Sequence, residues 1–149
     1  MICTLDSNVL VYAVVEPPEP RADRARELIV RCTRGNTAIL LLQALAEFST
    51  VAMRRHGLSA FDIQNRVDAL RQPIPVEAAA EEDLLAALDL VRDHRLAFWD
   101  AMMCATASRA GLQYLLSEDM EDGRRFGGLT IVNPFRPENA ALIDRILPP

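Results

Sequence analysis

The sequence of 149 residues contains no lysine, and all 16 of its positive charges are arginine. A P-loop requires a Gly-Lys pair before serine or threonine, so this class of nucleotide hydrolase is excluded. Phosphotransferases that pair an acid at a strand end with a lysine are excluded for the same reason. The absence of lysine therefore removes two common kinds of phosphate chemistry from consideration.

Cysteine is also scarce, at three residues. An odd number with no Cys-x-x-Cys spacing predicts neither a disulfide framework nor a zinc site. We expect Cys3, Cys32 and Cys104 to be small core residues in a reducing compartment.

Long apolar runs are missing as well. The longest, residues 37–46, is far shorter than a membrane span. The N-terminus lacks the basic region and apolar core of a signal peptide, so we expect a cytoplasmic protein that does not enter a membrane.

The composition that is present is globular, with 50% hydrophobic and 25% charged residues. This length predicts one domain, residues 1–149, with a core of ordinary size.

The net charge of −5 would disfavour nucleic acid as a partner. However, the arginine pairs 54–55 and 124–125 could contact RNA phosphates, be solvated or contact a partner. Acids gathered around cations would also make the total negative.

The hydrophobic pattern predicts strands and helices in alternation. Buried strands are expected at 2–5, 38–42, 113–116 and 129–132, with a very short one near 72–76. Helices are expected after residue 8 and at 21–34, 43–56, 59–71, 81–95, 98–110 and 138–146. A stiff loop at 16–20 ends the first helix. This order indicates an α/β fold with a mainly parallel sheet.

Several local expectations accompany this assignment. Gly35 and Gly57 are expected to end their helices, Gly35 in a left-handed conformation. Ser59 is expected to be an N-cap, with Asp62 at the capping-box position. The long helix at 81–95 should turn its apolar residues inward, namely Leu84, Leu85, Leu88 and Val91.

Four acids stand just beyond a strand end or in the first turns of a helix: Asp6, Glu47, Asp100 and Asp119. In a parallel sheet the carboxyl ends of the strands gather at one edge, where ligands bind. Four carboxylates there would repel one another unless they were protonated or neutralised by cations. Mg²⁺ or Mn²⁺ suits such oxygen ligands, and a pair of such ions can activate water against a phosphodiester.

Each acid also has an ordinary structural explanation. Asp6 could cap the helix that follows it, and Glu47 could be a surface residue. Asp100 could favour a helix N-terminus through the dipole. Asp119 could be a turn residue, and its place could be taken by a neighbour in the same loop, namely Glu118, Glu121 or Asp122.

Four segments that contain these acids, residues 5–13, 45–48, 99–101 and 116–123, resemble PIN-domain proteins, in particular VapC-type ribonuclease toxins. The resemblance extends over essentially the whole chain, with the motifs in the family's order. It implies a PIN-like three-layer α/β/α fold around a central, mainly parallel sheet of four to five strands.

The resemblance also implies an activity and a site. The protein would be a Mg²⁺- or Mn²⁺-dependent endoribonuclease specific for single-stranded RNA. It would form a homodimer and would be held inactive by a cognate antitoxin. By position, Asp6, Glu47, Asp100 and Asp119 would form the acidic quartet that binds metal. Asn8 and Ser117 would assist through hydrogen bonds, and Asp122 would be accessory.

Two other readings of the sequence remain. One is a PIN fold that has lost hydrolysis and binds RNA or protein. The other is a metal-free nuclease that uses His56 and His94, although nothing in the sequence brings these residues together and solvated helix ends suit them better. Phe98 and Trp99 could stack on a base, but beside a helix start we expect them to anchor the core.

Overall fold

A computed structural model describes residues 2–15 and 20–149. Most of the loop predicted at 16–20 therefore lies outside the described residues. The main sheet has four strands in the order β1-β4-β6-β5, of which β1, β4 and β6 run parallel and β5 runs antiparallel to β6. Their bounds are Cys3–Leu5 for β1, Tyr114–Leu116 for β4, Leu129–Val132 for β6 and Arg125–Phe126 for β5.

A second pair of short parallel strands continues the sheet beside β1. It consists of β2 (Leu40–Leu41) and β3 (Val76–Glu77). An isolated bridge between Cys3 and Ala38 joins this pair to β1, and the Ile39 amide donates to the Cys3 carbonyl at 3.0 Å. The predicted strand at 38–42 is thus present but reduced to two regular residues.

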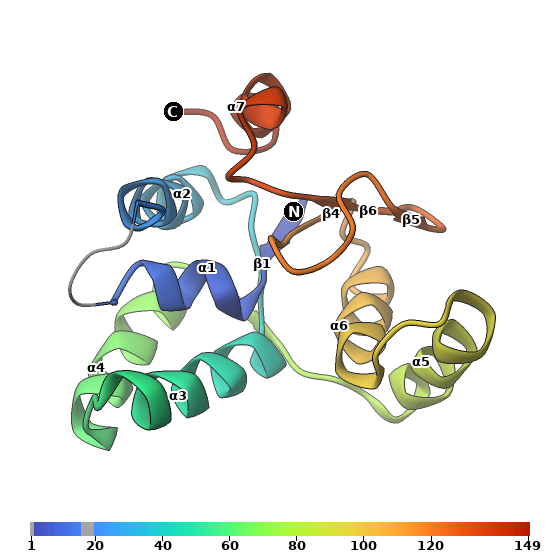
Figure 1. Ribbon diagram of the computed structural model, residues 1–149, viewed down its shortest axis with the longest axis horizontal. Coiled ribbons are helices and arrows are strands. Elements are labelled where there is room, and N and C mark those ends of the chain that lie inside the picture. The colour runs from blue at the N-terminus through green and yellow to red at the C-terminus, as the bar shows by residue number, and fades with distance from the viewer. Residues whose placement is uncertain (1, 16–19) are drawn as a thin grey trace.

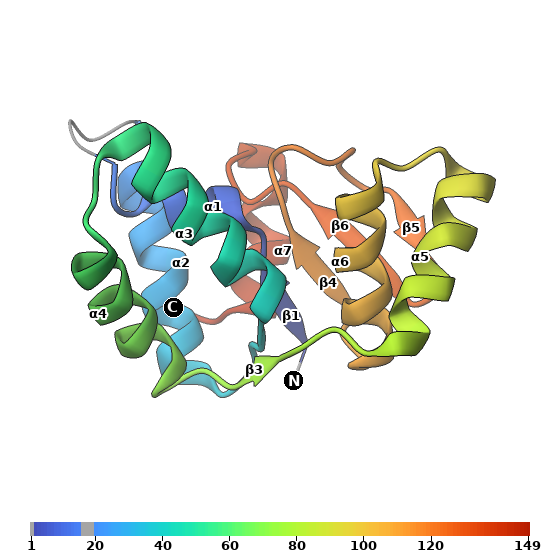
Figure 2. The same ribbon diagram turned by 90° about the horizontal axis from the view of Figure 1, so that it is seen from below.

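Helices cover both faces of the sheet. In Figures 1 and 2, α7 lies on one side of the strands β4 and β6, and α5 and α6 lie on the other. At the other end of the molecule, α1 packs against α2 and α3. The bounds are Ser7–Tyr12 (α1), Ala22–Gly35 (α2), Leu42–His56 (α3), Ala60–Arg71 (α4), Glu81–His94 (α5), Phe98–Arg109 (α6) and Ala140–Ile146 (α7), with a 3₁₀ turn at Pro137–Asn139. The predicted α/β fold, mainly parallel and in three layers, is confirmed.

The helix α6 is the central support of one face. Every residue from 101 to 107 is buried, so the middle of this helix is enclosed on all sides. Met103, Cys104 and Ala107 belong to the same core cluster as Leu115 of β4 and Ile131 of β6. Small residues in α6 allow neighbouring elements to approach closely, which fixes the position of its N-terminus relative to the strand ends.

The predicted inward face of α5 is wrong for three of its four residues; Val91 is half-buried and packs against the core, as predicted. Leu84, Leu85 and Leu88 are 44%, 66% and 48% exposed, whereas Ala87 is fully buried against α6. The helical period correctly identifies an apolar stripe, but a period does not reveal whether this chain covers the stripe. A row of leucines therefore faces outward along α5.

Asp83, which is paired with the partly exposed Arg109, takes an inward position on α5 instead. Asp83 is 1% exposed and accepts two hydrogen bonds from the Arg109 Nε, at 2.8 and 3.0 Å. Burial opposes ionisation of Asp83, but hydrogen bonds from Arg109 and from the Ala80 amide outweigh it and lower the pKa of the carboxyl. Arg109 also binds Glu77 at 2.9 Å. This network ties α5, α6 and β3 together.

Two predicted helix ends were tested, with different results. Gly57 ends α3 at φ 65°, the left-handed conformation in which a Cβ is unfavourable, as predicted. Gly35, by contrast, is the last residue of α2, and Asn36 takes the left-handed conformation with φ 47°. Asparagine tolerates this conformation better than most residues because its short side chain can bond locally.

The remaining local predictions are mostly confirmed. Ser59 caps α4 by accepting from the Asp62 amide at 3.1 Å. The three cysteines are free and buried. The strand β5 was not predicted from the sequence. In the described ranges 2–15 and 20–149, none of the helices has the length and apolar character needed to cross a membrane.

Candidate metal centre

Asp6 lies at the carboxyl end of β1 and is 5% exposed. Its amide donates to the Leu116 carbonyl at 2.9 Å, which extends the pairing of β1 with β4 by one residue. Its side chain accepts from the Ser7 amide at 2.6 Å and so caps α1. The capping role considered from the sequence is therefore real, and it holds the carboxylate at the strand end.

Ser117 occupies the equivalent position at the end of β4. It is fully buried, its amide donates to the Val132 carbonyl at 3.0 Å, and its hydroxyl donates to the Asp6 Oδ2 at 2.6 Å. Two neighbouring strand ends are thus joined by a side-chain hydrogen bond. Ser117 therefore holds one oxygen of the Asp6 carboxylate from the neighbouring strand.

Asn8, in the first turn of α1, links two acids. Its Nδ2 donates to the Asp6 Oδ2 at 3.1 Å and to the Asp119 Oδ2 at 3.2 Å. Asp119 is therefore the acid of its loop that meets Asp6. Its neighbours have other partners: Glu118 binds Arg21 and Tyr12, and Glu121 pairs with Arg124.

Glu47 reaches the same place from α3, which follows β2. The Ser7 hydroxyl lies between two acids, 3.2 Å from the Glu47 Oε2 and 3.3 Å from the Asp6 Oδ1. Gln43, one turn earlier on α3, donates to the Glu47 Oε1 at 2.7 Å and to the Trp99 carbonyl at 2.8 Å. These contacts fix α3 against the start of α6.

Asp100 completes the group in the first turn of α6, where it is half-buried. Burial and the negative charges of Glu47 and Asp119 raise the pKa of its carboxyl. Burial raises the pKa of Asp6 to about 6, with a further contribution from the charges of Glu47 and Asp119 and against the hydrogen bonds of Ser117 and Ser7. We call these four residues the acid cluster: Asp6, Glu47, Asp100 and Asp119.

The donor chemistry of the acid cluster fits a hard divalent cation. All four side chains offer carboxylate oxygens, and repulsion among them favours a ligand of positive charge. The buried Asn8 Oδ1 has no hydrogen-bond partner among the described residues. Within this same part of the chain, no three His, Cys, Asp or Glu side chains are already arranged as a metal-ligand set. The carboxylates would therefore have to close around an ion.

Asp122 lies apart from the acid cluster in its contacts. Its Oδ1 accepts from the Asn133 amide at 2.7 Å and from the Asn139 side chain at 2.9 Å. Arg136 approaches its Oδ2 at 3.6 Å. These bonds tie the acidic loop to the segment after β6, so an accessory contribution of Asp122 would be indirect.

Sequence reasoning missed two polar residues that organise the acid cluster, Ser7 and Gln43. Ser7 follows Asp6 directly, and Gln43 stands four residues before Glu47 on the same helix. The i,i+4 spacing of a glutamine and a glutamate was the available signal for Gln43. The contact of Gln43 with the Trp99 carbonyl had no signal in the sequence.

A pocket of about 520 Å³ opens beside the acid cluster. The predicted role of Trp99 as a core anchor is wrong, since its side chain is 62% exposed and lines this pocket. Phe98 is 36% exposed and meets the Trp99 ring edge-on, with the ring centroids 5.1 Å apart. Only the residues after Asp100 turn into the core. The pocket wall is completed by polar and small residues of α1 and α3: Ser7, Gln43, Ala46, Glu47, Thr50 and Val51.

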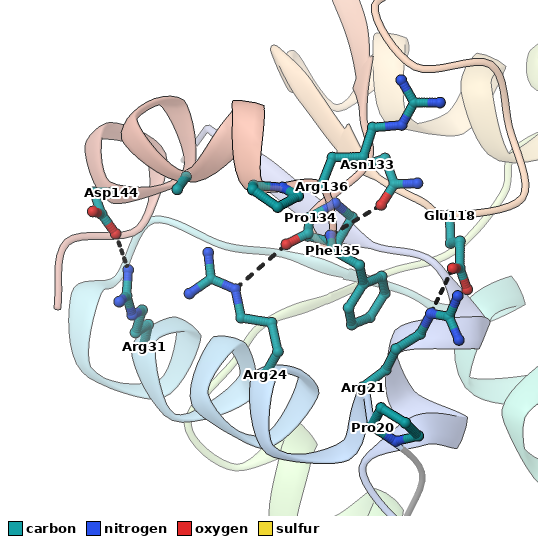
Figure 3. Close-up of a pocket in the computed structure, with 12 residues that line it drawn as sticks. Pro20, Arg21, Arg24, Arg31, Glu118, Asn133, Pro134, Phe135, Arg136 and Asp144 are labelled. Atoms are coloured by element: carbon teal, nitrogen blue, oxygen red, sulfur yellow. Dashed lines mark hydrogen bonds and ion pairs between the residues drawn. The ribbon is translucent and has the colours of Figure 1, made fainter.

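A larger pocket, of about 830 Å³, lies on the other side of Glu118. Figure 3 shows Arg21, Arg24, Arg31 and Arg136 around it, and the first three are joined there to an acid or a carbonyl. Arg136 lies 3.6 Å from the Asp122 Oδ2. Arg21 pairs with Glu118 at 2.6 Å and Arg31 with Asp144 at 2.7 Å, while Arg24 bonds Glu27 and the Pro134 carbonyl. Because these charges are already paired, the larger pocket is not a strong anion site.

The two histidines lie far from one another. His56 ends α3 and His94 ends α5, both are exposed, and these helices occupy opposite sides of the molecule (Figures 1 and 2). His94 packs edge-on against Phe126, with ring centroids 5.3 Å apart. A mechanism that uses both histidines is therefore not supported.

Comparison with known proteins agrees with this fold. The family model described as PIN domain matches residues 3–125. No curated protein is similar enough in sequence to count as a match.

Solved structures of similar fold include toxins and toxin–antitoxin complexes. VapC20 of Mycobacterium tuberculosis, described as a sarcin–ricin loop cleaving toxin, is 18% identical, with 78% of this chain and 91% of that chain covered and a TM-score of 0.63. VapBC2 of Rickettsia felis, bound to a promoter DNA fragment, is 17% identical, with 89% of this chain and 98% of that chain covered and a TM-score of 0.65. A toxin–antitoxin complex from Klebsiella pneumoniae is 19% identical, with 90% of this chain and 98% of that chain covered and a TM-score of 0.64. At these identities the likeness establishes the fold.

Proposed function

The chain belongs to the PIN-domain family, and from this premise we propose that it is a divalent-metal-dependent endoribonuclease and the toxin of a toxin–antitoxin pair. The observation that carries the proposal is the convergence of four acids from four separate segments. Asn8 joins Asp6 to Asp119, Ser7 joins Asp6 to Glu47, and the charges of Glu47 and Asp119 act on Asp100.

Mg²⁺, or Mn²⁺ in its place, would be held by Asp6 and Asp100, with Glu47 and Asp119 as the other carboxylates of the acid cluster. When bound, such an ion offsets their charge and lowers the pKa of an attacking water. The rest of the work falls to the chain itself. Ser117 and Ser7 hold the Asp6 carboxylate in one orientation, and Asn8 holds Asp119 near it.

A protein partner is part of the same proposal. The leucines of α5 form an apolar stripe that this chain leaves uncovered, and Phe61 on α4 is 71% exposed. Exposed apolar surface of this kind is typical of interfaces. It supports a homodimer and an antitoxin that binds the folded toxin. A cytoplasmic location follows from an RNA substrate and is proposed with it.

The first test is cleavage of a single-stranded RNA by the purified protein. We expect cleavage with Mg²⁺ or Mn²⁺ and none with EDTA. Asp100→Asn should reduce the rate by at least about a hundredfold, because removing an acid or a charged group from the chemical step costs this much or more. Asp89→Asn, which changes an exposed acid on α5, is the matched control and should cleave like the wild type.

Two results would contradict the proposal. Cleavage that continues in EDTA would exclude the metal, and equal rates for Asp100→Asn and the wild type would exclude the acid cluster. RNA that binds without being cleaved, under every ion tested, would assign the chain to the binding modules of the same fold.

A further inference from the structure

The most informative side chain outside the acid cluster is that of Trp99. It stands directly before Asp100, yet its indole is 62% exposed while residues 101–107 of the same helix are buried. A large aromatic side chain left in water at the edge of a pocket is uncommon unless something packs against it. The pocket of about 520 Å³ in front of it is within the size range of ligand sites.

The walls of this pocket differ in character. The indole of Trp99 and the small or apolar side chains of Ala46 and Val51 give flat and apolar contacts, whereas Glu47 and Asp100 bring negative charge. A phosphate would be repelled from the pocket itself. A neutral, planar, aromatic group with hydrogen-bond donors at its edge suits both kinds of wall.

One side chain ties the backbone of Trp99 to the acids. The Gln43 amide donates both to the Glu47 Oε1 at 2.7 Å and to the Trp99 carbonyl at 2.8 Å. The backbone of Trp99 is therefore tied to a member of the acid cluster. Anything that stacks on the indole would lie at a set place beside the carboxylates.

We propose that Trp99 is the stacking platform for one nucleobase of the RNA strand, held in this pocket next to the phosphodiester that the acid cluster attacks. The inference rests on the proposed function, because it takes single-stranded RNA to be what reaches the acids. Trp99 acts as a binding and positioning residue, since aromatic side chains stack on any base and place the adjoining phosphate.

The chain offers a direct probe, because Trp99 is its single tryptophan. Its fluorescence is therefore that of one side chain at the proposed position. In stopped-flow mixing, a short single-stranded RNA should quench this fluorescence saturably before cleavage occurs. An abasic strand of the same length, which keeps the charges and lacks the bases, should leave it nearly unchanged.

Variants separate stacking from folding and assembly. Trp99→Ala should weaken RNA binding by about 5- to 150-fold, the usual effect of removing an aromatic platform, and Trp99→Phe should retain most of the affinity. Met53→Ala, which removes an exposed apolar side chain from α3 outside the pocket, is the matched control and should bind like the wild type. Dye anisotropy of a labelled RNA measures the affinity for all variants.

The proposal is overturned by equal quenching with the abasic strand, by unchanged RNA affinity of Trp99→Ala, or by a change of Trp99→Ala from dimer to monomer in light scattering. The last result would make Trp99 a subunit contact. Quenching by RNA without any metal-dependent cleavage would support the stacking site and refute the nuclease activity. If cleavage depends on the carboxylates but Trp99→Ala cleaves with unchanged kinetics, the nuclease stands and the stacking site is refuted.

Discussion

Replacing Asp6 with asparagine is expected to stabilise the fold at neutral pH while it removes a member of the acid cluster. The carboxyl is 5% exposed, and its pKa is raised from 3.8 to about 6 by burial and by the charges of Glu47 and Asp119. The ionised form is thus unfavourable in the folded state. Asparagine keeps a side-chain oxygen at this position and carries no charge.

The size of the effect follows from the pKa. A rise of about two units corresponds to about 3 kcal/mol, at about 1.4 kcal/mol per unit. Between pH 3.8 and about 6 the unfolded chain has lost this proton and the folded chain still holds it. Stability of the wild type therefore falls as the pH rises through this window, and the loss is complete above it.

Urea unfolding in EDTA, at several pH values from about 4 to about 8, measures the difference between Asp6→Asn and the wild type. We expect almost no difference near pH 4 and a gain of about 3 kcal/mol for the variant at pH 7. Added Mg²⁺ should narrow the gap, because an ion that binds only the folded wild type stabilises it. Asp89→Asn should show no such dependence. A variant that is less stable than the wild type at pH 7 would refute the reasoning.

Two further predictions concern the scaffold. Asp83→Ala should lower the free energy of unfolding by about 1.5 kcal/mol, because it removes the charged hydrogen bonds that Asp83 makes with Arg109 and the Ala80 amide, while Arg109 is partly exposed and keeps Glu77 as a partner. Since the pKa of Asp83 is lowered, the wild-type advantage should hold above pH 4 and shrink as the pH falls further, and urea unfolding of both proteins checks this. Gly57→Ala should cost about 1 kcal/mol, because φ is 65° at the end of α3, and unchanged thermal unfolding would contradict it.

The sequence was sufficient for the order of elements because buried strands and amphipathic helices differ in period. It was also sufficient for the edge of the sheet at which the acids gather, since the parallel order places all strand ends there. Which acid of the loop 117–123 meets Asp6 was not available from spacing. Asn8 decides it by a hydrogen bond to Asp119, a contact between residues 111 positions apart.

The failures have a common physical cause. For Leu84 and Leu85 of α5 the pattern identified an apolar side but not what covers it. For Trp99 a residue at a helix start was taken as a core anchor, although the first turn of α6 leaves it exposed. In both cases exposure depends on what other elements or molecules cover the side chain, and local periodicity does not contain that information.

The short strand β5 escaped prediction for a different reason. It has two residues, Arg125–Phe126, and pairs antiparallel with the start of β6 across Gly127 and Gly128. A run of two residues has no measurable period. Its pairing is set by the neighbouring strand.

The central claim is that the acid cluster cleaves RNA, and one measurement in cells tests it most directly. The wild type and Asp100→Asn are expressed from an inducible promoter in a bacterial host, and new RNA 5′ ends are mapped across the transcriptome. The account predicts growth arrest and discrete new ends with the wild type alone. Equal arrest and the same new ends with Asp100→Asn would contradict it.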